Sequence, residues 1–117
     1  TIAAFAGTLR ESPTALAEML LAVDHRLAAP KEVVLVAAAS RAELAPFVAE
    51  LRGHFVPGNH LVMAVEGADL DAQAALVPFA RERRALDGKA TAYVCENRVC
   101  ELPTHDAKAF AVQLSRR

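Results

Sequence analysis

The fold of this chain is decided by one stretch near its C-terminus, Thr91-Ala-Tyr-Val-Cys-Glu-Asn-Arg-Val-Cys-Glu-Leu-Pro103. A polar tip interrupts an apolar run that resumes before the proline, which is the pattern of a tight β-hairpin. If Asn97 and Arg98 form a two-residue turn, Cys95 faces Cys100 in the closely spaced kind of antiparallel pair. A disulfide can bridge such a pair. We therefore expect the two cysteines of the chain to be neighbours.

The composition is that of one globular domain. With 117 residues, 54% hydrophobic and 23% charged, the chain is long enough to bury a single core. A net charge of −1 with interspersed signs gives no electrostatic footprint for nucleic acid or an anionic membrane. The longest apolar stretch, residues 33–39, is far shorter than the roughly 20 residues that span a bilayer. No signal peptide is visible and the first residue is Thr1, so we expect a cytoplasmic fragment or processed product.

Residues 1–28 are expected to form N-terminal helices. Ser12 and Pro13 are typical of an N-cap and of the first helical position. One apolar face then follows at helical spacing, made of Leu16, Met19, Leu20, Val23 and Leu27. Ordinary core packing is the simplest interpretation of this face. Residues 1–9 are interpreted as the stub of a helix whose partners lie outside the chain.

Residues 32–117 are predicted to form a β-α-β-α-β-β-α unit. Strands are expected at 32–38, 60–65, 89–95 and 99–102. The first two are expected to be buried, and helices separate the first three, which implies right-handed crossovers. The prediction is a single α/β domain, a small three-layer α/β/α sandwich. Its sheet is mostly parallel, with three parallel strands and an antiparallel edge strand from the C-terminal hairpin.

The helices between these strands carry their own start signals. Ser40 and Glu43 form a capping box, and Pro46 either kinks the helix that follows or marks its beginning. A broken helix is expected over residues 70–85. The last helix is expected to begin after Thr104 or Asp106 and to carry Phe110 and Leu114.

Neither a nucleotide nor a metal site is favoured. The turn at residues 37–40 has no glycine to admit a phosphate, and no Walker or G-x-G-x-x-G pattern occurs, so a nucleotide site rests on fold analogy alone. A zinc site would use Cys95, Cys100 and His105, with a fourth ligand improvised from Asp106 or a distant histidine. We expect no cofactor and no metal.

Catalytic groups are not indicated either. No nucleophile elbow occurs, and the carboxylates Glu66, Asp69 and Asp71 surround a turn, where acidic residues usually start a helix. The run Arg81-Glu82-Arg83-Arg84 could bind an anionic partner, but a mixed charge run is usually the solvated face of a helix. We assign no catalytic residue and expect that this chain alone is not an enzyme.

The cysteine pair is the one redox candidate. A reactive thiolate needs a helix N-terminus or a nearby cation, and the hairpin supplies only Arg98. A structural or slowly switching disulfide and a catalytic dithiol are both open for Cys95 and Cys100. Two reduced, half-buried thiols are the favoured state in a cytosolic protein.

The same hairpin carries a family resemblance. The run Gly88-Lys-Ala-Thr-Ala-Tyr-Val-Cys-Glu-Asn97, followed by Val99-Cys100, Pro103 and Asp106, resembles the C-terminal end of the large thioredoxin-domain-containing proteins. Animal members of that family are of the spermatogenesis-associated protein type. The resemblance implies a parent protein with a thioredoxin-like domain and an α/α toroid upstream, and it makes Cys95 and Cys100 the family's C-terminal cysteine pair. One departure is Ala37-Ala38, where the family is expected to have a glycine and an acidic residue.

The resemblance implies an accessory or docking domain without catalysis of its own. Residues 1–9 and the apolar face that begins at Leu16 would join it to the toroid, and the isolated chain would then self-associate. The alternative is a thiol–disulfide module in which Cys95 and Cys100 cycle, exchanging with the thioredoxin-like domain. A third hypothesis is a small ligand at the carboxyl edge of the sheet.

Overall fold

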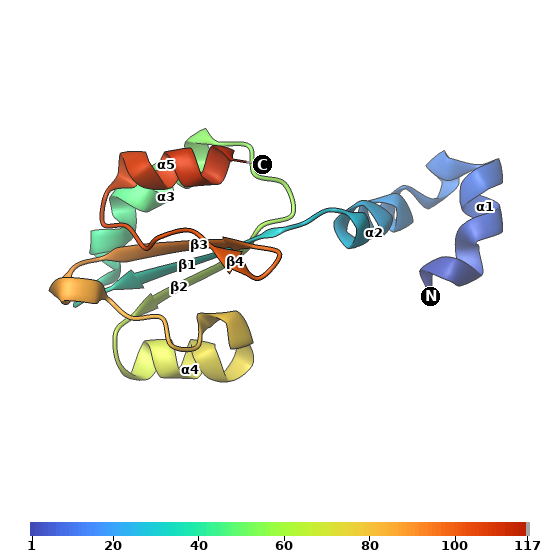
Figure 1. The fold of residues 1–117 in the computed structure, drawn as a ribbon. Coiled ribbons are helices and arrows are strands. Elements are labelled where there is room, and N and C mark those ends of the chain that lie inside the picture. Colours follow the sequence, from blue (N-terminus) through green and yellow to red (C-terminus); the bar gives the residue numbers. More distant parts are fainter. Residues whose placement is uncertain (117) are drawn as a thin grey trace.

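The computed structural model describes residues 1–116 and has a mixed α/β body from which N-terminal helices project (Figure 1). Its α-helices are α1 (Ala6–Glu11), α2 (Ala17–Leu27), α3 (Ala45–Gly53), α4 (Ala68–Leu76) and α5 (Ala107–Ser115). Its strands are β1 (Lys31–Ala37), β2 (His60–Val65), β3 (Thr91–Glu96) and β4 (Val99–Cys100). Short 3-10 turns are η1 (Ile2–Phe5), η2 (Pro13–Leu16), η3 (Arg41–Leu44), η4 (Pro78–Ala80) and η5 (Leu86–Gly88).

The four strands form one mixed sheet in the order β2-β1-β3-β4. Strand β1 is central and fully buried over residues 33–37, as its continuous run of β-branched and apolar residues predicts. It pairs in parallel with β2 and antiparallel with β3, and β3 turns into the antiparallel edge strand β4. The α/β class and the hairpin edge strand are confirmed. The prediction of three parallel strands is wrong for β3, which is antiparallel to β1.

The path from α4 to β3 explains this reversal. A broken helix was expected over residues 70–85; the break is present, since α4 ends at Leu76 and Pro78 begins η4, but η4 ends at Ala80 and no helix continues to residue 85. The chain then folds back along the same face, and the Ala85 N–H donates to the carboxylate of Glu66, which follows the carboxyl end of β2. Strand β3 therefore begins at that end of the sheet, with Thr91 opposite Val36, and must run antiparallel to β1.

Helices cover both faces of the sheet, which confirms the three-layer sandwich (Figure 1). On one face α3 and α5 enclose the core residues Val33, Leu35, Ala37, Leu44, Phe47, Ala92, Val94, Phe110 and Leu114. On the other, α4 and η4 enclose Val34, Val36, Val62, Ala64, Leu70, Ala80 and Tyr93. The rings of Phe47 and Phe110 meet edge to face, with centroids 5.5 Å apart, which ties α3 to α5. Strand β2 lies at the edge, so Leu61 is exposed, and the expectation of a second fully buried strand is wrong.

The caps follow the sequence closely in the body of the fold. The Glu43 carboxylate accepts the Ser40 N–H at 2.8 Å, which confirms the capping box, and α3 begins at Ala45 with Pro46 in its first turn. Asp106 caps α5 by accepting the Ala109 N–H at 2.7 Å.

The N-terminal helices do not share this core. None of the residues in η1, α1, η2 or α2 is buried, and these helices extend away from the sheet (Figure 1). Helix α2 meets the body at its C-terminal end, where the rings of His25 and His60 lie 5.2 Å apart. Core packing of the Leu16 face is therefore a wrong prediction, and Ser12 makes no side-chain cap bond. No helix within residues 1–116 has both the length and the apolarity that crossing a bilayer requires.

Candidate functional site

The hairpin places both cysteines where the sequence predicts them. Cys95 lies opposite Cys100, their Cα atoms are 4.0 Å apart, and their sulfurs form a disulfide. The turn residues Asn97 and Arg98 have φ values of 52° and 65°, as the two-residue primed turn requires. The register is confirmed, and the structure holds the bonded form rather than the favoured pair of reduced thiols.

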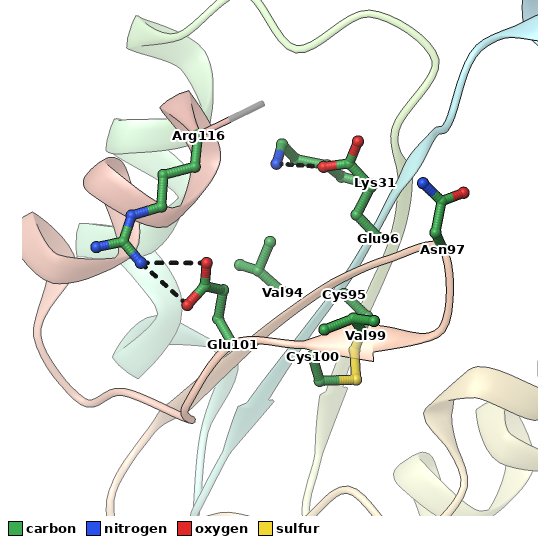
Figure 2. Close-up of a pocket in the computed structure, with 9 residues that line it drawn as sticks. All are labelled: Lys31, Val94, Cys95, Glu96, Asn97, Val99, Cys100, Glu101 and Arg116. Atoms are coloured by element: carbon green, nitrogen blue, oxygen red, sulfur yellow. Dashed lines mark hydrogen bonds and ion pairs between the residues drawn. A yellow bond between two sulfur atoms is a disulfide. The ribbon is translucent and has the colours of Figure 1, made fainter.

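The two faces of this hairpin offer different surroundings. On the side of α5 lies a cavity of about 430 Å³ with Val94 in its lining (Figure 2). Two ion pairs border the cavity, Lys31 with Glu96 at 3.0 Å and Arg116 with Glu101 at 3.1 Å. These charges neutralise one another, so among residues 1–116 no unpaired charge lines the cavity. Cys95 and Cys100 also contribute to the lining of the cavity, but Figure 2 shows their sulfurs on the other side of the hairpin from both ion pairs.

Arg83 is the side chain that faces the disulfide. Its Nη2 atom donates toward both sulfurs, at 3.5 Å from Cys95 Sγ and 3.3 Å from Cys100 Sγ. The guanidinium carbon lies 5.1 Å from the centre of the Tyr93 ring, a cation–π distance. Its Nε atom is buried and has no hydrogen-bond partner among the described residues.

The loop that carries Arg83 is anchored on both sides of it. The Tyr93 hydroxyl donates to the Arg84 carbonyl at 2.7 Å and accepts the Arg84 N–H at 3.2 Å. The Glu66 carboxylate accepts the Ala85 N–H at 2.6 Å. These bonds hold the backbone of the loop beside the hairpin. The contacts of the guanidinium with the Tyr93 ring and the two sulfurs then fix the position of the Arg83 side chain.

The structure corrects the reading of residues 81–84. They are not the solvated face of a helix, because α4 has already ended and Glu82 has a left-handed φ of 64°. Arg83 and Tyr93 are thus the candidate site residues beside the disulfide that sequence reasoning missed. The one signal that could have found them is the absence of apolar residues at helical spacing after Ala80, which argues against a helix there.

This arrangement can do thiol–disulfide chemistry. A cation beside a sulfur favours the thiolate, and among the described residues it is Arg83, and not the predicted Arg98, that donates toward the sulfurs. A disulfide is uncharged, and among residues 1–116 no carboxylate forms an ion pair with Arg83. The guanidinium therefore gains an anionic partner when the bond is reduced to a thiolate.

The carboxyl edge of β1 is already occupied by a carboxylate of the chain itself. Glu43 accepts the N–H groups of Ala38 at 3.0 Å, Ala39 at 2.9 Å and Ser40 at 2.8 Å. The Ser40 N–H, followed by those of Ala38 and Ala39, lowers the pKa of Glu43 below its ordinary value. The donors that a phosphate would use are thus satisfied internally, and nothing here favours the third hypothesis.

The acidic residues near Gly67 also have structural partners. Asp69 accepts the Val65 N–H at 2.9 Å and pairs with Arg41 at 2.9 Å. The Val65 N–H is the main cause of the lowered pKa of Asp69, and the Arg41 charge adds to it.

The zinc set is not brought together. His105 binds the Ala90 carbonyl at 3.0 Å, next to the start of β3, whereas Cys95 lies near its end, about 13 Å further along the strand. No group of three or more metal-ligating side chains occurs within the part of the chain that the structure describes.

Comparison with known proteins relates the chain to part of a much longer one. Over 105 residues, 90% of the chain, it is 30% identical to spermatogenesis-associated protein 20 of Homo sapiens. It is 25% identical over the same length to the proteins of that name from Rattus norvegicus and Mus musculus. The chain spans only 13% of the length of these relatives. No protein-family model and no solved structure matches it.

Proposed function

We propose that this chain is an accessory docking module of a larger protein, without catalysis of its own, and that its N-terminal helices are the attachment surface. The observation that carries the proposal is the unburied apolar face of α2. Two side chains of that face are exposed in the described structure, by 40% for Leu20 and 80% for Leu27, and Leu21, on another side of α2, is exposed by 64%. Phe5, before α1, is exposed by 40%. Exposed apolar side chains on one helix face are typical of a contact with another part of a protein.

The rest of the parent chain is the proposed occupant of this surface. The relatives are far longer than this chain, which leaves ample sequence to supply a partner. The family resemblance implies an α/α toroid and a thioredoxin-like domain as the neighbouring parts, and we propose a cytoplasmic location on the sequence alone. In this proposal α2 packs against the toroid, and the α/β body is held beside it.

The test is the association state of the 117-residue chain in sedimentation velocity over a range of concentrations. We expect concentration-dependent self-association, since copies would cover each other's α2 faces. The double substitution of Leu20→Glu and Leu27→Glu places two charges on that face and should give a monomer. Leu76→Glu, at an 82% exposed position in α4, is the matched control and should associate like the wild type. A chain that is monomeric at every concentration would contradict the proposal.

A second function is favoured by a separate observation, the contact of Arg83 with both sulfurs. In this alternative Cys95 and Cys100 form a thiol–disulfide exchange module. Disulfides in the cytosol are transient, so a bond there must open within the cellular range of potentials.

Redox titration of the intact chain tests this alternative. The alkylated mass of the native protein, measured across glutathione buffers, should change between roughly −220 and −320 mV. In the full-length parent, Cys95→Ser should abolish activity without unfolding this domain. A bond that stays closed throughout that range, or thiols that stay reduced, would leave the hairpin a structural element.

A further inference from the structure

We propose that an incoming thiolate attacks Cys100 and that Cys95 leaves as a thiolate stabilised by Arg83. This inference deepens the second function proposed above and rests on it. It assigns a separate role to each sulfur: access from solvent selects the sulfur that is attacked, and Arg83 stabilises the thiolate that leaves.

Access distinguishes the two sulfurs. Cys100 belongs to the two-residue edge strand β4, which is exposed, and β4 has no further strand beyond it. Cys95 is only 5% exposed, since it lies between β1 and β4 in the sheet and under the Arg83 loop. A thiolate on a protein or peptide can therefore approach Cys100 from solvent but meets packed residues at Cys95.

Electrostatics allows the buried sulfur to leave as a thiolate, because Arg83 contacts both sulfurs. A buried thiolate without a cation is unfavourable, and thiolates are stabilised by a nearby positive charge. The Arg83 Nη2 atom lies 3.5 Å from Cys95 Sγ and 3.3 Å from Cys100 Sγ, and the guanidinium lies over the Tyr93 ring, next to the anchored Arg84 backbone. Its half-buried charge has no carboxylate partner within residues 1–116, so it is available to the sulfur that leaves.

The proposed step needs a dithiol as reductant, and its electrons balance as follows. One thiolate of the dithiol forms a bond to Cys100 Sγ, the Sγ–Sγ bond breaks, and its electron pair goes to Cys95 Sγ, beside Arg83. The second thiolate of the dithiol then attacks the dithiol sulfur that is bonded to Cys100 Sγ in the mixed disulfide. This step releases the Cys100 thiolate. The dithiol becomes a disulfide, the cysteine pair gains two electrons, and the thiolates take up protons from water according to pH.

Arg98 lies between the two cysteines in the sequence, so the sulfur that the incoming thiolate attacks can be identified directly. Trypsin cleaves after Arg98, so Cys95 and Cys100 fall in separate peptides, residues 90–98 and 99–108. The oxidised 117-residue chain is mixed with reduced glutathione, and N-ethylmaleimide is added at low conversion to cap every free thiol. We expect glutathione on 99–108 and the maleimide on 90–98, in at least about fivefold excess over the reverse pattern, as attack at one sulfur requires.

The stabilisation of the leaving Cys95 thiolate by Arg83 is tested by substitutions at Arg83. Arg83→Gln should slow opening of the disulfide by dithiothreitol by roughly threefold to tenfold, because the leaving thiolate loses its cation. Arg83→Lys should restore part of the rate. Arg81→Gln, the same charge change on the same loop, should stay within about twofold of the wild type. In the reduced protein, alkylation of Cys95 should require a higher pH in Arg83→Gln than in the wild type or in Arg81→Gln. A purely structural effect of the substitution would leave the pH profile of Cys95 alkylation unchanged.

The possible outcomes distinguish failure of the redox function from failure of the roles assigned to the two cysteines and Arg83. A disulfide that does not open in glutathione buffers overturns the redox function and this inference with it. A disulfide that opens but carries glutathione equally on both peptides, or mainly on 90–98, overturns the assignment of roles and leaves the redox function standing. An Arg83→Gln chain that opens at the wild-type rate, with an unchanged alkylation profile, overturns the role of Arg83.

Discussion

Replacing Tyr93 with phenylalanine removes one oxygen atom from the loop that carries Arg83. That hydroxyl donates to the Arg84 carbonyl at 2.7 Å and accepts the Arg84 N–H at 3.2 Å. The ring stays, and with it the packing against the sheet and the stacking distance to the guanidinium. Tyr93→Phe is therefore a test of the hydroxyl alone.

The expected loss of stability follows from two hydrogen bonds. Each contributes about 0.5–1.5 kcal/mol net, which gives about 1–3 kcal/mol for the pair. Tyr93 is only 5% exposed, but Arg84 is on the surface, so water can satisfy part of what the backbone loses. We therefore expect a value near the lower end, about 1–2 kcal/mol.

Urea unfolding followed by circular dichroism measures this change with the disulfide intact. Tyrosine fluorescence cannot be used, because Tyr93 is the single tyrosine of the chain and there is no tryptophan. The unfolding midpoint should fall while the denaturant slope is unchanged. Ser115→Ala, which removes a hydroxyl bonded within α5, is the control and should remain within about 0.5 kcal/mol of the wild type. A Tyr93→Phe chain as stable as that control would show that the hydroxyl does not hold the loop.

Two further predictions concern the helices on the opposite face. Phe110→Ala should lower the free energy of unfolding by about 3–5 kcal/mol, since that ring is fully buried, and Val112→Ala, at a 51% exposed position, should change little in the same urea titration. The pKa of Glu43 is lower in the folded protein than its ordinary value of 4.5, so the hydrogen bonds of its carboxylate stabilise the fold at pH values above 4.5. This stabilisation is lost as the pH falls through the pKa of Glu43 in the folded protein. Glu43→Gln should therefore give a flatter dependence of stability on acid pH than Glu18→Gln, on the exposed helix α2, and identical profiles would contradict the cap.

The parts of the fold that the sequence predicts are those with a local physical cause. The register of Cys95 and Cys100 depends on a two-residue turn, and the caps at Glu43 and Asp106 depend on spacings of three residues. The buried run of β1 identifies a central strand from composition alone. Each of these features is confirmed in the structure.

The parts that could not be predicted depend on contacts between distant segments. Strand β3 runs antiparallel because residues 77–90 fold back over the sheet, and the bond between Ala85 and Glu66 that fixes this path joins residues 19 apart. Arg83 meets the sulfurs for the same reason, across 12 and 17 residues of sequence. The apolar face of α2 predicts a buried helix, but no residue of α2 is buried in the structure, because periodicity does not say what packs against a face.

The direction of β3 also decides how the two proposed surfaces are related. Because β3 is antiparallel to β1, its last residue Glu96 lies opposite Lys31, the first residue of β1, and their side chains form an ion pair. Lys31 follows α2 closely in sequence, so the hairpin with its disulfide emerges at the end of the sheet from which the N-terminal helices project (Figure 1). A parallel β3 would have carried Cys95 to the opposite end. A partner docked on α2 would therefore lie beside the exposed Cys100, which joins the docking and thiol-exchange proposals in one geometry.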